Sequence, residues 1–173
     1  MAVVLILVGG LAIAGERSLQ AGRETSAVQS IQSFVADETT YQRSYGGFSP
    51  SATNLEAPGA SAQNACGADG EIPVQLGATI AGNTVAGGTA NGGYWLFYAA
   101  AGGFNGSACG GGVTTPAPVN TSFEITANPV DGKTKSLCGG SDGITFYLPA
   151  GSVMANAGAG CLADNPGSLP VGQ

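Results

Sequence analysis

Two hydrophobic patterns follow one another within residues 1–45, with no turn signal between them. Residues 1–14 form an uncharged apolar run, MAVVLILVGGLAIA, and residues 15–45 mix polar and apolar positions. In the second part, apolar residues recur at spacings of three and four, which places them on one face of a helix. They are Ala27, Val28, Ile31, Phe34 and Val35. The pattern predicts one helix that ends at Gly46-Gly47, because a glycine pair readily forms the left-handed cap.

The apolar half of this helix needs an environment that the rest of the chain does not obviously supply. Residues 1–45 would form a helix roughly 65 Å long, which exceeds the body of a domain of this size. The apolar run is nevertheless shorter than the roughly 20 apolar residues that span a bilayer. We therefore weigh several interpretations of it.

The first interpretation is a secretory signal peptide, because Ala12-Ile13-Ala14 resembles a cleavage site, although no Lys or Arg precedes the run. The second is a buried core helix. The third, which we favour, is that the sequence begins inside a longer apolar helix. A break near Gly15, followed by an ordinary surface helix, is the alternative to one continuous helix.

Three later segments alternate in the way that is typical of β-strands. Residues 93–99, GYWLFYA, are apolar on both faces, so we expect a central strand or one whose outer face meets a neighbouring subunit. Residues 122–129 predict a half-buried strand whose exposed face carries Glu124, Thr126 and Asn128. Residues 144–148 predict a third strand, after a turn through Asp131-Gly132 and the Gly139-Gly140 region.

These elements predict an α+β fold in which an antiparallel β-meander packs against the long helix. Val28, Ile31 and Val35 are the residues expected to contact the sheet. We divide the chain into a stem helix, residues 1–47, and a head, residues 48–173. Within the head, residues 47–70 look loop-like, and residues 73–81 fit either a helical turn or a strand. The segment after Pro149 is expected to lie irregularly on the surface, held by Cys161.

The composition favours a secreted structural protein over an enzyme. Charged residues make up 9% of the chain, against roughly 25% in an average globular domain. The formal net charge is -6, and no basic cluster lies outside Arg17, Arg23 and Arg43 on the stem. The sequence therefore predicts no direct nucleic-acid site in this subunit.

Four cysteines are the candidates for covalent cross-links: Cys66, Cys109, Cys138 and Cys161. They are even in number and widely spaced, and the chain has no histidine, so disulfides in an exported protein are a better interpretation than a zinc site. Four cysteines allow three connectivities. We favour Cys66–Cys109 with Cys138–Cys161, because each bond would tie a long irregular segment to a strand end. Free buried thiols are the alternative.

Catalytic and metal-binding arrangements are sparse. The absence of histidine excludes Ser-His-Asp and Cys-His arrangements, and we interpret Lys133 and Lys135 beside Ser136 as charges of a turn. Asp131 and Asp142 flank a glycine-containing loop, but a calcium site needs about six oxygen ligands. We therefore predict neither enzymatic activity nor a cofactor or metal.

The N-terminal residues carry a resemblance to a known family. An apolar start followed by ETSAV at 24–28, YQRSYGGF at 41–48 and Asn54-Leu55 is similar to the N-terminal half of bacterial type IV pilins and the related pseudopilins. The similarity covers about the first third of the chain. Residues 93–98, 122–129 and 142–147 sit where that family places strands. The family's basic leader, peptidase site, aromatic first residue and nearby glutamate have no counterpart here. Because Met1–Val4 resembles the stretch just after that glutamate, we expect a natural start further upstream.

The resemblance implies a structural subunit of an extracellular pilus-like filament that serves adhesion, motility or DNA uptake. Its expected partners are other copies of itself, the inner membrane before assembly, and the pilus assembly machinery. The expected polymerisation core is Val3, Val4, Leu5, Ile6, Leu7, Val8, Leu11 and Ile13. The residues expected to lose helical structure on assembly are Gly9, Gly10 and Gly15. A type II secretion pseudopilin and a membrane-anchored exported binding domain are the alternatives.

Overall fold

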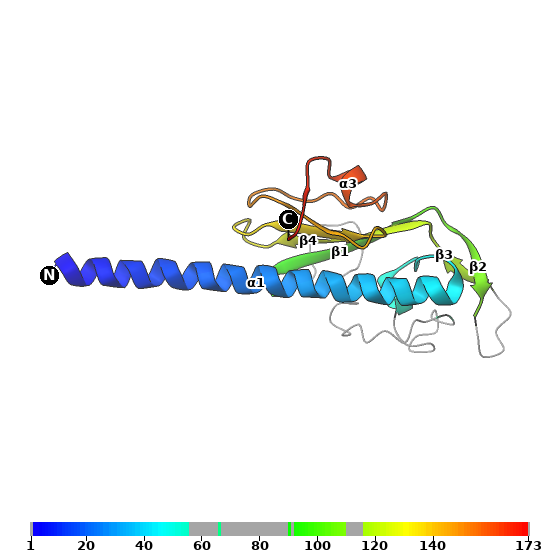
Figure 1. Cartoon of the computed structure of the whole chain (residues 1–173), viewed down its shortest axis with the longest axis horizontal. Helices are drawn as coiled ribbons and strands as arrows, with labels where there is room; N and C mark the ends of the chain where they lie inside the picture. The colour runs from blue at the N-terminus through cyan, green and yellow to red at the C-terminus, as the bar shows by residue number, and fades with distance from the viewer. Residues whose placement is uncertain (1, 56–65, 67–89, 91, 110–115, 173) are drawn as a thin grey trace.

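A single long helix runs the length of the molecule and extends beyond the rest of it (Figure 1). The computed structural model describes residues 2–55, 66, 90, 92–109 and 116–172, with residues 2–14 and 53 described by their backbone. Helix α1 spans Ala2–Tyr45 without interruption, so the alternative of a break near Gly15 is wrong. It ends where Gly46 adopts a φ of 87° and donates its N–H to the carbonyl of Gln42 at 2.8 Å.

The head contains a five-stranded antiparallel sheet with the order β1-β4-β5-β6-β7. Its strands are β1 (Tyr94–Ala101), β4 (Ser122–Pro129), β5 (Ser136–Gly140), β6 (Thr145–Leu148) and β7 (Leu169–Pro170). Strands β1 and β4 pair along their full length, from Tyr94 opposite Pro129 to Ala101 opposite Ser122. The sheet lies along the second half of α1 (Figure 1). The prediction of an α+β fold is confirmed.

Smaller elements complete the head. Strands β2 (Phe104–Ala108) and β3 (Pro116–Val119) form an antiparallel ribbon with an irregularity between Asn105 and Ala108. A short 3-10 helix, η1 (Ala52–Leu55), follows α1, and the helical turn α3 (Cys161–Asp164) lies near the C-terminus. The ribbon lies at the end of the head where α1 finishes (Figure 1).

The hydrophobic core lies between α1 and the sheet. Its fully buried members include Ile31 and Phe34 from α1, Phe123 and Ile125 from β4, and Leu137 from β5. Such burial contributes about 1.5–3 kcal/mol for each large apolar side chain. The core therefore fixes the second half of the helix to the head.

Two strand predictions need correction. Strand β1 lies at the edge of the five-stranded sheet, and β4 beside it has neighbours on both sides, so the first alternative for residues 93–99, a central strand, is wrong. The second alternative, an outer face that meets a neighbouring subunit, stays a prediction. The Gly139-Gly140 region was assigned to a turn, but both glycines belong to β5, whose five residues are all buried. The glycine was misleading as a turn signal because glycine is needed here for packing. A Cβ on Gly139 would collide with Ile31 Cγ2.

The predicted solvent-exposed face of β4 is also wrong. Glu124 and Thr126 are fully buried, and Asn128 is nearly so. Residues 152–159, which we call the C-terminal strap, bond to this face. The tail after Pro149 is thus more ordered than expected, since it contains the strap, α3 and β7. The prediction for residues 73–81 lies outside the described residues.

Candidate functional site

The contact between stem and sheet is the first candidate site. Ile31 is fully buried, while Val28 and Val35 are half-buried and pack against the same core. Ile31 Cγ2 occupies the space that a Cβ on Gly139 would need, so the helix lies directly on the backbone of β5. This close approach is an apolar contact between α1 and the sheet.

Aromatic rings extend the contact toward the end of the helix. The ring of Phe34 lies 5.2 Å from that of Tyr98 on β1, and the rings of Phe48 and Phe123 are 4.8 Å apart, measured between centroids. Tyr41 is fully buried, and its hydroxyl donates to the carbonyl of Pro118 on β3 at 3.2 Å. Tilted aromatic pairs of this kind each add about 0.5–1.5 kcal/mol beyond their burial.

A buried carboxyl group lies within this interface. Glu38 is fully buried, and its Oε2 accepts the backbone N–H of Ser49 at 2.9 Å. Its Oε1 contacts the hydroxyl of Ser49 and accepts from the hydroxyl of Tyr98 at 2.8 Å. Burial raises the pKa of Glu38 to about 7, although the bonds from Ser49 and Tyr98 oppose the shift. The network therefore links α1, the loop after it and β1.

The spacing of the helix positions contains a signal for Glu38. The buried residues Ile31, Phe34, Glu38, Tyr41 and Tyr45 follow one another at intervals of three and four. A carboxylate at one of these positions faces the core and needs donors there. Helical periodicity extended past Val35 would have identified it.

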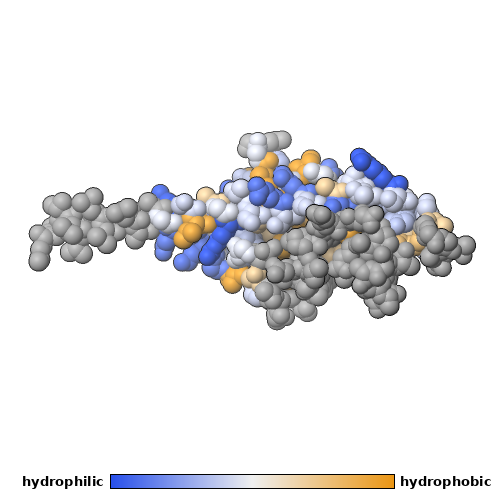
Figure 2. Space-filling view, turned by 90° about the horizontal axis from the view of Figure 1, so that it is seen from below, coloured by the Kyte–Doolittle hydropathy of each residue, from blue (hydrophilic) through white to orange (hydrophobic). Residues whose placement is uncertain are grey.

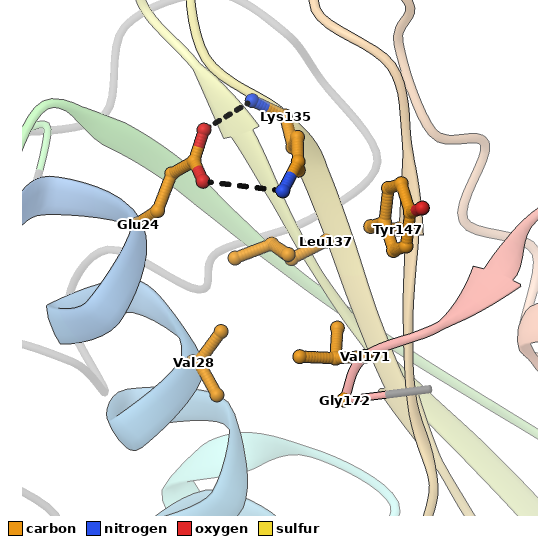
Figure 3. Close-up of a pocket in the computed structure, with 7 residues that line it drawn as sticks. All are labelled: Glu24, Val28, Lys135, Leu137, Tyr147, Val171 and Gly172. Carbon is orange, nitrogen blue, oxygen red and sulfur yellow. Dashed lines mark hydrogen bonds and ion pairs between the residues drawn. The ribbon is translucent and has the colours of Figure 1, made fainter. Parts of the chain in front are cut away.

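A small open pocket lies where α1 leaves the sheet, with a volume of about 180 Å³ (Figure 3). Val28, Leu137 and Val171 form its apolar wall, and Glu24 faces Lys135 across one side. The ammonium group of Lys135 lies 3.6 Å from Glu24 and 4.9 Å from the centre of the Tyr147 ring. Among the described residues that line the pocket, the two charged side chains pair with each other.

The C-terminal strap is held on β4 by hydrogen bonds to the side chains of that strand. Asn128 makes two of them with Met154, donating to its carbonyl at 3.0 Å and accepting its N–H at 2.8 Å. Ser122 donates to the carbonyl of Gly158 at 2.8 Å, and Asn156 donates to Thr126 at 3.0 Å. The alternate polar residues of β4 thus serve as partners for the strap.

The cysteines form two pairs, in the connectivity that we favoured. Cys66 pairs with Cys109 and Cys138 with Cys161, with Cα–Cα distances of 5.1 and 5.8 Å. The second bond joins β5 to the first residue of α3. It therefore ties down the chain just after the strap.

The acidic residues considered for calcium do not come together. Asp131 lies in the turn before β5 and Asp142 in the turn after it, so the strand separates them. Asp131 is paired with Arg23 at 3.4 Å. Among the described residues, Glu124 gathers with Cys138 and Cys161, but the two sulfur atoms are bonded to each other and are therefore not thiolate ligands.

The described surface shows no extended apolar face in the view of Figure 2, where hydrophobic and hydrophilic residues are interspersed. The most exposed large apolar side chains are Val153 at 68% and Leu19 at 67%. Within the residues whose side chains are described, no helical segment is both long and apolar enough to cross a bilayer. The side chains of the predicted polymerisation core, Val3 to Ile13, lie outside that set.

Comparisons with known proteins identify no relative. No family model matches the sequence, and neither the curated proteins nor the solved structures give a significant match. The function must therefore be inferred from the sequence and the geometry of this chain.

Proposed function

We propose that this chain is the structural subunit of an extracellular, type IV pilus-like filament. The observation that carries the proposal is the course of α1, whose second half packs on the sheet while its first half extends beyond the head (Figure 1). The sequence of the extending half is uncharged over residues 1–14. Such a segment favours an apolar environment, which other copies of the same helix or a membrane can provide.

In the proposed filament, the apolar halves of many subunits pack together and the heads lie outside. Val3, Val4, Leu5, Ile6, Leu7, Val8, Leu11 and Ile13 form the core of this packing. Apolar burial contributes about 25 cal/mol per Å², and the contribution is repeated in every subunit. Head-to-tail contacts that do not close into a ring generate a helical fibre.

The head has features that suit this role. The helix is fixed to it by the Ile31–Gly139 contact, the aromatic rings and the Glu38 network. Two cysteine pairs favour an oxidising compartment outside the cytoplasm. We propose that the chain is inserted in the inner membrane before assembly and is polymerised by pilus assembly machinery.

Electron microscopy of surface filaments tests the proposal. Filaments sheared from the native cells should contain this chain as their dominant protein by mass spectrometry, and deletion of its gene should remove them. Leu7→Asp should abolish the filaments, because a charge in the packed core is unfavourable, whereas Leu7→Ile should retain them.

Two other results would replace the proposal. Recovery of the chain from membranes of cells without filaments would favour an anchored exported binding domain. Short filaments confined to the periplasm and required for protein secretion would favour a pseudopilin.

A further inference from the structure

Two acidic side chains from different elements hold three successive amide groups of the strap. Glu124 on β4 is fully buried, and its Oε1 accepts the N–H of Gly158 at 3.1 Å. Asp164 at the end of α3 accepts the flanking N–H groups on its Oδ2, from Ala157 at 3.0 Å and from Ala159 at 3.2 Å. The end of the strap is therefore fixed through carboxyl groups on both sides.

The other oxygen of Glu124 lacks a donor. Oε2 is buried and has no hydrogen-bond partner among the described residues. Because the two carboxyl groups accept from consecutive amides of the strap, they lie near each other, and Asp164 is among the groups that raise the pKa of Glu124. Two ionised carboxylates in such a place repel each other, and a single shared proton turns the repulsion into a hydrogen bond.

In the part of the chain that the structure describes, the elements around Glu124 bring no cation to the pair. Ala99 of β1 lies opposite Glu124 on one side, and Gly140 of β5 lies opposite it on the other. The Cys138–Cys161 bond is adjacent and uncharged. Among the described groups, Asp164 is the charged residue that acts on Glu124. Burial and then Asp164 raise the pKa of Glu124 to about 7, against the opposing bond from Gly158.

We propose that Glu124 and Asp164 share one proton and form a pH-sensitive clasp that closes the C-terminal strap over β4. With the proton present, the two acids bond to each other and to the strap. Loss of the proton leaves like charges in a buried contact and favours lifting of the strap end from β4. Because Cys161 stays bonded to Cys138, the movement is limited to the strap and leaves the sheet intact. This inference does not rest on the proposed function.

The direction of the pH effect follows from the pKa of Glu124 in the closed and open forms. The closed form has a pKa of about 7, and the open form should have the ordinary value of 4.5. The contribution of the shared proton to closure is therefore full below pH 4.5 and is lost as the pH rises through about 7. The population of the open form should rise on the order of a hundredfold across this window.

Amide hydrogen exchange measured by NMR on the full chain in neutral detergent tests the clasp. Protection factors of Ala157, Gly158 and Ala159 should fall on the order of a hundredfold between pH 4.5 and 7.5. In Glu124→Gln they should be nearly independent of pH, because the amide side chain keeps an acceptor for Gly158 and donates to Asp164. Glu38→Gln, in a separate buried network, is the matched control. In this variant the protection factors of the strap should fall with pH as they do in the wild type.

Three results would overturn the clasp. The first is a wild-type protection factor that does not change with pH. The second is a fall in Glu124→Gln as large as in the wild type. The third is protection that calcium restores above pH 7 in the wild type alone, which would indicate a bound cation. Asp164→Asn provides a second variant if Glu124→Gln does not fold. It keeps an acceptor oxygen for the strap and should weaken the pH dependence, because the like charge is gone.

Discussion

The hydroxyl of Tyr98 on β1 lies 2.8 Å from Oε1 of Glu38 on α1, inside the contact between helix and sheet. Ser49, which follows the end of α1, bonds to both oxygens of the same carboxyl group. Three parts of the chain therefore meet at one titratable group. Its protonation should influence the stability of the whole head.

We expect the wild-type head to be more stable at pH 4.5 than at pH 8. The pKa of Glu38 is about 7 in the folded chain and should return to the ordinary 4.5 on unfolding. Its contribution is therefore full below pH 4.5 and lost as the pH rises through about 7, a change of roughly 3 kcal/mol. Urea unfolding at several pH values measures it.

Glu38→Gln isolates this effect. The variant should lose stability less steeply between pH 4.5 and 7 than the wild type, because glutamine keeps an acceptor and does not ionise. Glu16→Gln on the exposed part of α1 is the control and should leave the slope unchanged. Equal slopes in all three proteins would contradict the role assigned to Glu38.

Ile31→Asp should destabilise the head by several kcal/mol, because it places an unpaired carboxylate in a fully buried position. A loss of that size is comparable with the total stability of many domains. Leu19→Asp on the same helix, at a side chain that is 67% exposed, should change the melting temperature little. Circular dichroism of the full chain in neutral detergent compares them, and equal midpoints for Ile31→Asp and the wild type would refute the assigned contact.

Two glycines, one in a packed contact and one with open space around it, should respond differently to replacement by alanine. Gly139→Ala should destabilise by about 1–3 kcal/mol, since its Cβ would collide with Ile31 and lie 3.2 Å from Val35 Cγ2. Gly22→Ala should stabilise by up to about 1 kcal/mol, because a Cβ there meets nothing within 4 Å and alanine favours helix. Chemical unfolding measures both, and a neutral Gly139→Ala would indicate a looser interface.

Both disulfides should be present in the protein purified from its native compartment. Intact-mass measurement after alkylation without reductant should show no added label, and after reduction it should show label on all four cysteines. Loss of the Cys138–Cys161 bond, whose residues are 23 apart, should cost about 3 kcal/mol in the chain-entropy model. Labelling of the unreduced protein at all four positions would show the thiol form instead.

Part of residues 8–17 should be non-helical in the proposed filament. Gly9, Gly10 and Gly15 each weaken the helix by about 1 kcal/mol relative to alanine. Extended chain rises about 3.3 Å per residue against about 1.5 Å in a helix, so a filament map that resolves side chains distinguishes them. Unbroken helix from Ala2 to Tyr45, as in the isolated chain, would contradict this prediction and leave the filament proposal standing.

The sequence revealed those features that depend on neighbouring positions along the chain. Val28, Ile31 and Val35 share one helix face by periodicity alone, and all three pack on the core. The burial of Glu124 could not be found this way, because the strap that covers it comes from residues 152–159, about 30 positions away. Gly139 was assigned to a turn because the sequence does not show that Ile31 lies opposite it and leaves no room for a Cβ.

The course of α1 beside the strands also decides how the head would carry mechanical load. Strands β1 and β4 run alongside the helix rather than across it (Figure 1). Tension applied to the stem would therefore shear the interface, so that Ile31, Phe34 and Tyr41 resist together. A perpendicular pull would instead peel these contacts apart one at a time. The head is thus built to be strongest along the axis of its own helix.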